Sequence, residues 1–542
     1  MNVSRFLDRM SAQQGDTAAL MIPRGRKGSG EIDYLRLTFR ELAEEQDAWA
    51  TRLSERGVEK GSRVLLMARP GLPLIALCFA LFKMGAVPIV IDPGMGLRSF
   101  LSCVRRSEPD ALVGIGLAIW VSRLFRGAFR SVRAKVKVGG ALSRAPREEG
   151  KVAFAAAETG ADDLAAILFT SGSTGAPKGV CYEHGMFEAQ VEAIRSEYGI
   201  EPGEIDLPML PIFALFNPAL GMTTVVPEIN PSKPASVDPA KIVQAIGQCG
   251  VTNSFGSPVL WKKIGAYCER EGKRLPSLKR ILMAGASAPP ELMRQFRGLL
   301  ENGRAYSPYG ATEVLPVSSI VDEDIVALAS GEATLGKGTC VGSPLPGVEV
   351  RILPMSDADM GCQALEAALP TGSIGEIVAT GPSVTKEYDR LPESTRAAKI
   401  VDGDRVWHRM GDLGYFDEGG RLWFCGRKVE RVETEETVFY TDCCEGVFNR
   451  LTEVNRSALI AVKENGKTMP GMAIEPAPGS FPANDRERAA FIEKLKETGS
   501  LSETTKSIER FFFEKAFPVD VRHNAKIHRL SLAKRISERA NR

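Results

Sequence analysis

A strand–helix–strand pattern in residues 63–92 constrains the fold more than any other feature. Residues 63–68 (RVLLMA) and 87–92 are short apolar runs, and residues 72–84 between them are apolar over a helical length. This order predicts a βαβ unit with parallel strands and a right-handed crossover. A second strand–helix signal follows at residues 278–284 and 289–300, where two prolines suit a helix start. The sequence therefore predicts an α/β fold built on parallel sheets.

The length of the chain indicates more than one structural unit. At 542 residues it exceeds a single ordinary core. The pattern changes near residue 428, after which a strand at 458–462 and helices at 487–497 and 506–515 are expected. We predict two domains, a large one at residues 1–427 and a small α+β one at residues 428–542.

The longest charge-free apolar stretch, residues 207–227, has the length of a membrane span. It contains four prolines, each costing about 3 kcal/mol inside a helix. We therefore predict buried strand and loop, forming a pocket wall, and no transmembrane segment. The Gly- and Pro-rich residues 336–347 predict loops. The first residues lack a secretory apolar core, so we expect a cytoplasmic protein.

The overall charge excludes several classes of protein. There are 69 Lys and Arg against 67 Asp and Glu, a net charge of +2. A chain without a strong positive field is not expected to bind nucleic acid in bulk. The 44% hydrophobic content disfavours disorder. The ten cysteines include no CxxC pair, so neither a zinc site nor a thioredoxin-type motif is predicted.

One segment is nevertheless strongly basic. Residues 123–137 contain six Lys or Arg and no acidic residue, and five of these recur at helical spacing: Arg123, Arg126, Arg130, Arg133 and Lys137. We predict a helix here. Two interpretations stay open, an ordinary surface helix and a docking face for a partner or an acidic lipid headgroup.

A Ser-, Thr- and Gly-rich loop follows an apolar strand at residues 164–169. Its glycines let the backbone approach an anion, its hydroxyls and N–H groups can surround phosphate oxygens, and its lysine supplies charge. The residues are Thr170, Ser171, Gly172, Ser173, Thr174, Gly175 and Lys178. A Walker loop has its lysine directly after a glycine, whereas Lys178 follows Pro177. His184 follows closely and is a candidate pocket-lining residue.

Three further motifs follow in order. They are Tyr309-Gly310-Ala311-Thr312-Glu313, then Gly411-Asp412 with Gly426-Arg427, then Asn524-Ala525-Lys526. Together with the phosphate loop, they resemble the signatures of the adenylate-forming superfamily of acyl-CoA synthetases, luciferases and peptide-synthetase adenylation domains. The resemblance implies a large N-terminal domain of layered α/β sheets and a small C-terminal domain hinged near residues 428–430.

The resemblance also implies ATP and Mg²⁺ as cofactors, and a role for each motif. The phosphate loop and Lys178 would hold the β- and γ-phosphates, and Thr312 would touch the α-phosphate. Glu313 would hold Mg²⁺. The nucleoside would be held by Tyr309 and Gly310, by Gly285, Ala286 and Ser287, and by Asp412 and Arg427. Lys526 would bridge the attacking carboxylate and the α-phosphate.

Departures from the usual patterns narrow the resemblance. Residues 428–445 contain no glycine, although superfamily members that use coenzyme A normally have one there, and Ala525 stands where a glycine usually precedes the lysine. The chain is most similar to the β-lactone synthetases of bacterial olefin biosynthesis. That implies adenylation of a long-chain 2-alkyl-3-hydroxy fatty acid, then attack of its own 3-hydroxyl to close a lactone.

Other interpretations remain open. The same motifs fit a long-chain fatty acyl-CoA or acyl-carrier ligase. A different class would be a catalytically silent nucleotide-binding scaffold, although the lysines and carboxylates needed for chemistry are all present. The resemblance further implies two partners, the reductase and the decarboxylating hydrolase of the olefin pathway.

Overall fold

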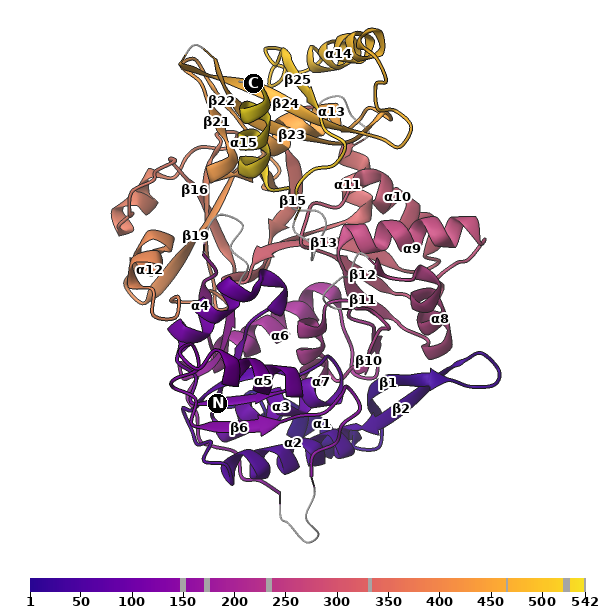
Figure 1. The fold of residues 1–542 in the computed structure, drawn as a ribbon, viewed down its shortest axis with the longest axis vertical. Coiled ribbons are helices and arrows are strands. Elements are labelled where there is room, and N and C mark those ends of the chain that lie inside the picture. The colour runs from indigo at the N-terminus through magenta and orange to yellow at the C-terminus, as the bar shows by residue number, and fades with distance from the viewer. Residues whose placement is uncertain are drawn as a thin grey trace.

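The computed structural model describes residues 1–146, 153–169, 176–230, 236–329, 334–464, 466–519 and 527–540. Two large sheets and their helices form the body, and a small sheet with its own helices lies at one end (Figure 1). Among the described residues, no helix combines the length and apolar character needed to cross a bilayer. The predicted α/β class is confirmed.

One large sheet has six strands in the order β6-β5-β3-β4-β7-β8. Its strands are parallel except at the β7–β8 pair. The strands are β3 (Arg63–Met67), β4 (Val87–Val90), β5 (Ala111–Gly114), β6 (Ala134–Lys137), β7 (Leu164–Phe169) and β8 (Gly179–Glu183). Helices in this part are α1 (Arg5–Gln14), α2 (Phe39–Ser54), α3 (Leu72–Met84), α4 (Leu97–Ser107), α5 (Gly116–Leu124) and α6 (His184–Tyr198).

Helix α3 shows why the βαβ prediction succeeds. All its residues except Leu74 are buried, and all except Lys83 are apolar, so the helix packs against protein on nearly every side. Gly85 ends it in the left-handed conformation, at φ +65°, where a residue with a side chain would be strained. Strands β3 and β4 then pair in parallel, as predicted.

The second sheet has fourteen strands within the described chain. Its central strands run in the order β13-β12-β11-β9-β10 and are parallel. The strands are β1 (Ala18–Arg26), β2 (Ile32–Thr38), β9 (Ile205–Asp206), β10 (Thr223–Val225), β11 (Asn253–Gly256), β12 (Arg280–Met283), β13 (Arg304–Ala311), β14 (Val314–Val321), β15 (Thr339–Pro344), β16 (Glu349–Leu353), β17 (Gly375–Thr380), β18 (Lys399–Asp402), β19 (Arg405–Phe416) and β20 (Leu422–Arg427).

Helices accompany this second sheet along the chain. Those beside β11–β13 bury Trp261 and Phe296 edge to face, with ring centroids 5.2 Å apart. The helices are α7 (Asn217–Leu220), α8 (Pro239–Cys249), α9 (Pro258–Arg270), α10 (Pro290–Leu299), α11 (Asp322–Ala329) and α12 (Pro392–Ala398), with 3₁₀ turns η2 (Pro211–Leu215) and η5 (Cys362–Ala367).

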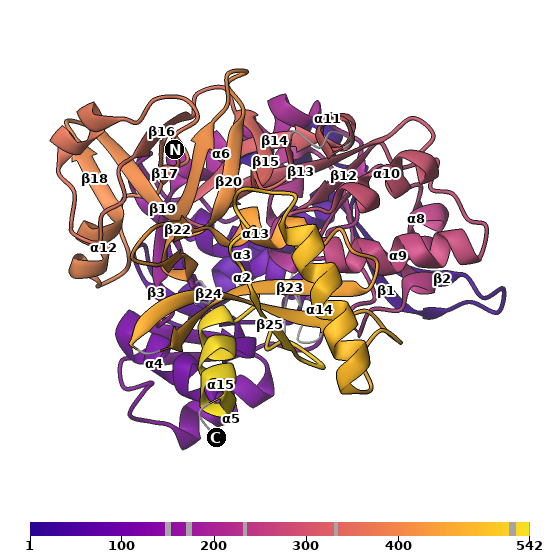
Figure 2. The ribbon, with the colours of Figure 1, turned by 90° about the horizontal axis from the view of Figure 1, so that it is seen from above.

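The C-terminal part follows a short 3₁₀ turn, η6 (Lys428–Glu430), which lies at the expected hinge. Its three-stranded sheet packs on two apolar clusters of its own, and Figure 2 shows α14 and α15 lying across it. The elements are β21 (Val432–Glu433), β22 (Val438–Phe439), α13 (Thr441–Phe448), β23 (Val454–Glu464), β24 (Lys467–Pro476), α14 (Asp485–Gly499), β25 (Arg510–Phe513) and α15 (Arg529–Ala540). The domain limits themselves stay a prediction.

Two helix predictions are wrong. The basic segment 123–137 is not one helix: α5 ends at Leu124 and residues 134–137 form β6. Gly127 interrupts the helical pattern, and pairing with β5 fixes the rest as strand. Residues 506–515 contain strand β25 instead of a helix, because the aromatic run Phe511-Phe512-Phe513 pairs in parallel with β24.

Two loop predictions also need correction. Residues 336–347 contain strand β15, which pairs with β14 and β20. Residues 207–227 form η2, α7 and β10 instead of strand and loop alone. Proline at the start of η2 and α7 is compatible with a first helical turn, where its missing N–H leaves no bond unmade.

Candidate active site

The ribose end of the predicted site is a trio of side chains around the buried Asp412. Asp412 on β19 lies opposite Arg427 at the end of β20, in register, and its Oδ1 is 2.9 Å from Arg427 Nη1. The Tyr309 hydroxyl, from β13, donates to Asp412 Oδ2 over 2.7 Å. Burial and the Asp412 charge raise the pKa of Tyr309 well above its usual value, so the phenol stays protonated and donates. The structure thus brings Tyr309 to Asp412 and Arg427, from which the sequence separates it by more than a hundred positions.

The nucleoside side of this trio is formed by the ends of two adjacent strands. Gly285, Ala286 and Ser287 follow β12, which pairs with β13. The Tyr309 ring packs against Phe424, with centroids 6.1 Å apart. A Cβ at Gly310 would lie only 2.8 Å from the Val314 carbonyl oxygen, so the tight return from β13 to β14 requires glycine there.

The phosphate end gathers residues from three separate segments. Glu313 Oε1 accepts a 2.7 Å hydrogen bond from the Tyr388 hydroxyl. Lys178 Nζ lies 4.7 Å from the centre of the Tyr388 ring, a cation–π geometry. The Thr312 carbonyl oxygen accepts from the Tyr182 hydroxyl. Two predicted residues, Lys178 and Glu313, therefore meet at Tyr388, which the sequence did not identify, and Thr312 directly precedes Glu313.

A buried lysine supports this end from behind. Lys399 on β18 donates from Nζ to the carbonyl oxygen and hydroxyl of Thr385. Thr385 in turn donates to the Glu313 carbonyl oxygen from its N–H (2.9 Å) and its hydroxyl (3.1 Å). Burial lowers the pKa of Lys399 to about 7, partly opposed by the nearby Glu313 charge. The sequence signal for Lys399 is weak: it begins the short strand Lys399–Asp402, in which only Ile400 and Val401 are apolar.

His408 lies beside this lysine. It is paired in register with Lys399 across β18 and β19 and is buried. Burial, followed by the Lys399 charge, holds the pKa of His408 well below its ordinary value. The imidazole is therefore neutral at physiological pH.

His184 does not line the site, contrary to the expectation. It is buried at the start of α6, where its Nδ1 accepts the Val3 N–H over 3.3 Å. Burial lowers its pKa to about 4. Thr170, Ser171, Gly172, Ser173, Thr174, Gly175 and Lys526 lie outside the described residues.

An apolar cavity opens along the same sheet edge as the nucleoside side. It lies at the carboxyl ends of β9 and β10, two to three strands from Gly285, which is about 10–15 Å at the usual strand spacing. Its walls are Pro70, Gly71, Leu74, Ile75, Pro208, Met209, Pro211, Ala214, Thr224, Val226, Pro227 and Ile229. The expectation that residues 207–227 form a pocket wall is confirmed.

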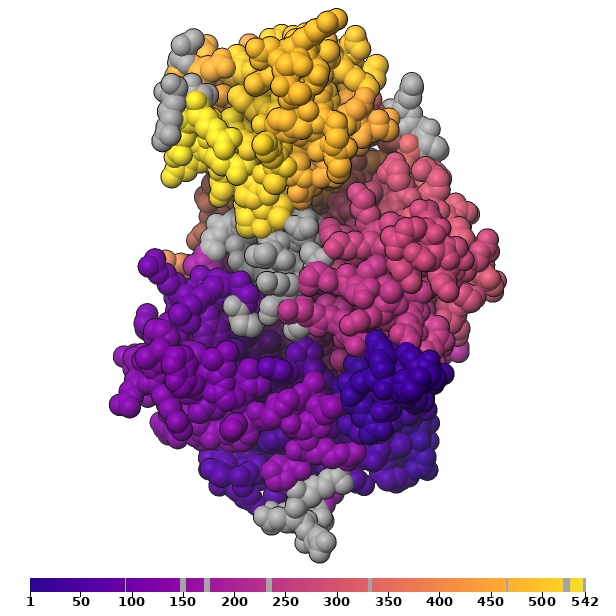
Figure 3. Space-filling view, turned by 45° about the vertical axis from the view of Figure 1, so that its right-hand side comes forward, coloured from indigo at the N-terminus to yellow at the C-terminus, as the bar shows by residue number. Residues whose placement is uncertain are grey.

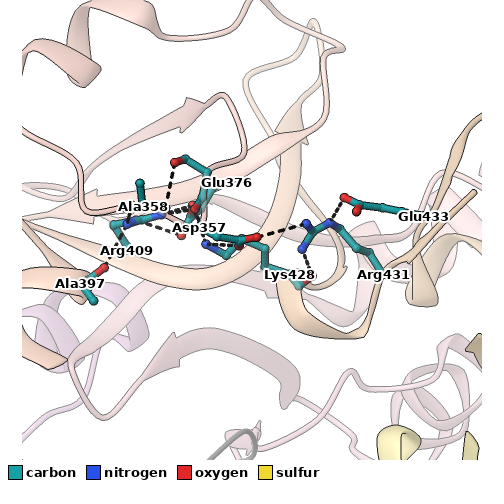
Figure 4. A network of polar contacts seen from close by, with 9 residues as sticks. Asp357, Ala358, Glu376, Ala397, Arg409, Lys428, Arg431 and Glu433 are labelled. Carbon is teal, nitrogen blue, oxygen red and sulfur yellow. Dashed lines mark hydrogen bonds and ion pairs between the residues drawn. The ribbon is translucent and has the colours of Figure 1, made fainter. Parts of the chain in front are cut away.

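A network of ion pairs and hydrogen bonds joins β17 and β19 to η6, at the expected hinge (Figure 4). Glu376 on β17 holds both Arg409 (2.7 Å) and Lys428 (3.2 Å), and all three are largely buried. At the C-terminal end of η6, Glu430 pairs with Arg529 of α15 at 2.9 Å. Arg529 also pairs with Glu445 at 2.6 Å. The first residue of η6 is thus tied to the larger part of the molecule, and its last residue is tied to the C-terminal part.

Comparison with known proteins identifies the family. The model of the AMP-binding enzyme family matches residues 7–389, well over half of the chain. The chain belongs to this family. The resemblance inferred from the motifs is therefore confirmed.

Curated relatives extend the match over nearly the full length. The chain is 41% identical to an olefin beta-lactone synthetase of Xanthomonas campestris pv. campestris, over 98% of this chain and 97% of that protein. It is 40% identical to the olefin beta-lactone synthetase of Stenotrophomonas maltophilia, with the same coverage. A long-chain-fatty-acid–CoA ligase of Thermus thermophilus is 26% identical, over 85% of this chain and 83% of that protein.

Solved structures show the same fold. The amide bond synthetase McbA from Marinactinospora thermotolerans aligns with a TM-score of 0.78 at 22% identity, over 98% of this chain and 99% of that one. ATP-bound MatB from Rhodopseudomonas palustris gives 0.78 at 21% identity, over 99% of both chains.

Proposed function

We propose that this AMP-forming ligase is a β-lactone synthetase of long-chain olefin biosynthesis. It adenylates a 2-alkyl-3-hydroxy fatty acid with ATP, releasing pyrophosphate, and then closes the β-lactone and releases AMP. The observation that carries this proposal is the 41% identity to an olefin beta-lactone synthetase across 98% of the chain. The lower identity and coverage of the CoA-ligase relative favour cyclisation over thioester formation.

The ribose end would fix the nucleotide. Asp412 has two carboxylate oxygens with spare acceptor capacity beyond their bonds to Tyr309 and Arg427, which suits a pair of ribose hydroxyls. The ring of Tyr309 and residues Gly285, Ala286 and Ser287 would enclose adenine. Arg427 would reach the ribose and the α-phosphate.

The phosphate end would hold the leaving pyrophosphate. Lys178, Thr312 and the loop Thr170–Gly175 would contact the phosphates. The approach of two anions, carboxylate and α-phosphate, requires positive charge at the reacting atoms, and we assign the central role to Lys526.

Glu313 fits a magnesium site. A carboxylate oxygen is the ligand type that Mg²⁺ prefers, and the ion is commonly held by one or two carboxylates together with substrate phosphates. The Tyr388 hydroxyl engages only Glu313 Oε1 and fixes the carboxylate orientation. Bound Mg²⁺ would offset negative charge on the phosphates.

The substrate's own 3-hydroxyl would act as the nucleophile in the second step. It forms a bond to the acyl carbon, loses its proton and expels AMP. Intramolecular attack by a well-oriented group can reach effective molarities of ~10⁵ M or more, which helps to offset ring strain. The apolar cavity beside β9 and β10 would hold an alkyl chain.

A product assay tests the proposal. The enzyme is mixed with ATP, Mg²⁺ and a long-chain 2-alkyl-3-hydroxy acid, with and without coenzyme A, and the product is identified by NMR. A β-lactone and AMP formed independently of coenzyme A support it. An acyl-CoA formed only with coenzyme A contradicts the proposal and indicates an acyl-CoA ligase. Absence of pyrophosphate release with any fatty acid indicates a silent scaffold.

Lys526→Ala should separate adenylation from nucleotide binding. We expect pyrophosphate release to fall by at least about a thousandfold, because an unshielded carboxylate must approach the α-phosphate. ATP affinity, measured by calorimetry, should change less than about threefold. Equal loss of binding and adenylation would contradict the role given to Lys526.

We further propose a cytoplasmic enzyme that works with the reductase and the decarboxylating hydrolase of the pathway. All ten cysteines are unpaired, which suits a reducing compartment.

A further inference from the structure

Helix α5 carries an exposed apolar row. Leu117, Trp120 and Leu124 are 65%, 58% and 59% exposed. Their spacing places them on one face of the helix, while Ala118 and Ser122 are buried on the other. Single exposed apolar residues are common, but a contiguous row that includes a tryptophan marks an interaction surface.

Basic residues surround this row. Between residues 111 and 146 the chain has seven Lys or Arg and no acidic residue, although its overall charge is only +2. Arg105, Arg123 and Arg126 line a surface hollow together with Leu124 and Phe125. In the described part of the chain, none of these three arginines forms an ion pair, whereas Arg130 meets Glu108 at 3.5 Å. Residues 111–146 belong to the purple flank of the molecule in Figure 3.

The charges of Arg123 and Arg126 also act on a neighbouring cation. The pKa of Lys135, on the neighbouring strand β6, is lowered by partial burial and then by repulsion from Arg123 and Arg126. A surface of this kind attracts a partner with dense negative charge.

We propose that the α5 surface, formed by Leu117, Trp120, Leu124, Arg123 and Arg126, docks the enzyme on a membrane containing anionic lipids. Tryptophan is enriched at the membrane–water interface, and a helix with an apolar face and flanking arginines lies in that interface. Tryptophan and arginine are also enriched at protein interfaces, so these residue types alone do not select the partner. The seven basic residues between 111 and 146, with no acidic residue among them, favour a surface of dense negative charge such as an anionic membrane. The arrangement therefore fits a charged lipid surface better than a protein partner.

The α5 surface lies near the apolar cavity. Helix α5 starts directly after β5, and Gly71, a cavity wall, follows the parallel neighbour β3. The Leu72 N–H donates to the Ala141 carbonyl oxygen, just beyond β6, over 3.0 Å. All three strands therefore end at one edge of the six-stranded sheet. If the proposed substrate is correct, its alkyl chains would partition into the lipid that this edge faces.

Vesicle flotation tests the proposal independently of catalysis. The full-length protein is mixed with phosphatidylcholine vesicles, with and without about one-third phosphatidylglycerol, and bound protein is measured in the floating fraction. We expect binding only to the anionic vesicles, and a decrease as salt is raised. Wild-type protein that fails to float with anionic vesicles, or floats equally with neutral ones, overturns the proposal.

Variants locate the surface. Trp120→Ser with Leu124→Ser should abolish flotation, and Arg123→Gln with Arg126→Gln should weaken it about 25-fold, at about fivefold for each cation. Leu501→Ser is the matched control, because Leu501 is 72% exposed in the C-terminal part. Thermal melting and turnover of detergent-dispersed substrate show that each variant is folded; if the serine pair is not folded, the glutamine pair decides.

Two variant results would overturn the assignment. One is an equal loss of flotation in Leu501→Ser. The other is a wild-type oligomer that the serine pair converts to a monomer with vesicle binding unchanged, which would make α5 an interface between copies of the chain.

Discussion

The two ends of the candidate site neutralise charge in different ways. At the ribose end, the Asp412 carboxylate is buried against Arg427 at 2.9 Å and lies on paired strands. At the phosphate end, Glu313 forms no ion pair within the described residues; it accepts a hydroxyl from Tyr388. The ribose end is thus electrostatically complete in the protein alone, whereas the phosphate end keeps a carboxylate able to receive a cation.

Disrupting the ribose end should have the largest effect. Asp412→Ala leaves the Arg427 guanidinium without its anion and removes the proposed ribose acceptor. We expect kcat/KM for ATP to fall at least about a hundredfold and the free energy of unfolding to fall by about 3 kcal/mol. Pyrophosphate release and chemical denaturation measure the two effects.

The matched control is Asp357→Ala, since Asp357 is 79% exposed and also lies near a cation, Lys428. It should change both quantities little. If Asp412→Ala bound ATP as well as the wild type does, the ribose end would not be a nucleotide site.

Tyr388→Phe removes the hydroxyl that donates to Glu313 Oε1. Because a hydrogen bond to a charged group contributes about 1.5 kcal/mol, we expect the concentration of Mg²⁺ needed for half-maximal activity to rise about tenfold, with a smaller change in kcat. Titration of pyrophosphate release against Mg²⁺ measures the shift. Tyr415→Phe, whose hydroxyl donates to the Lys337 carbonyl oxygen, is the control. An unchanged Mg²⁺ requirement in Tyr388→Phe would argue against Glu313 as the metal ligand.

Lys399→Met tests the buried cation of the phosphate end, with the smallest effect. The pKa of Lys399 is about 7 in the folded protein and near 10.5 when unfolded, so the unfolded chain binds more protons between these values. The free energy of unfolding of the wild type should therefore rise with pH relative to that of Lys399→Met, by about 1 kcal/mol between pH 7 and pH 8. Well below pH 7, the two free energies should change with pH in parallel. Urea unfolding at several pH values measures it. Parallel pH profiles for the two proteins would show that Lys399 titrates normally.

The sequence predicted some parts of the site well and others not at all. Tyr309, Asp412 and Arg427 belong to local motifs, and the structure brings them together. Tyr388 and Lys399 lie in segments without a local pattern, and only long-range packing brings them near Glu313: Tyr388 forms a bridge with Val180 of β8, and Lys399 pairs with β19. The fold shows the same division: the βαβ unit at residues 63–92 follows from local periodicity, whereas β6 and β25 depend on strand partners that helical spacing does not reveal.

The short hinge has a mechanical consequence. Lys428 is tied to Glu376, and Glu430, two residues later, is tied to Arg529. Two residues of chain span at most about 7 Å, so the two anchor points cannot separate further than that. While both ion pairs hold, the C-terminal part can pivot about η6 but cannot slide along the larger part. Any large movement of the C-terminal part would therefore be a rotation whose axis passes close to η6.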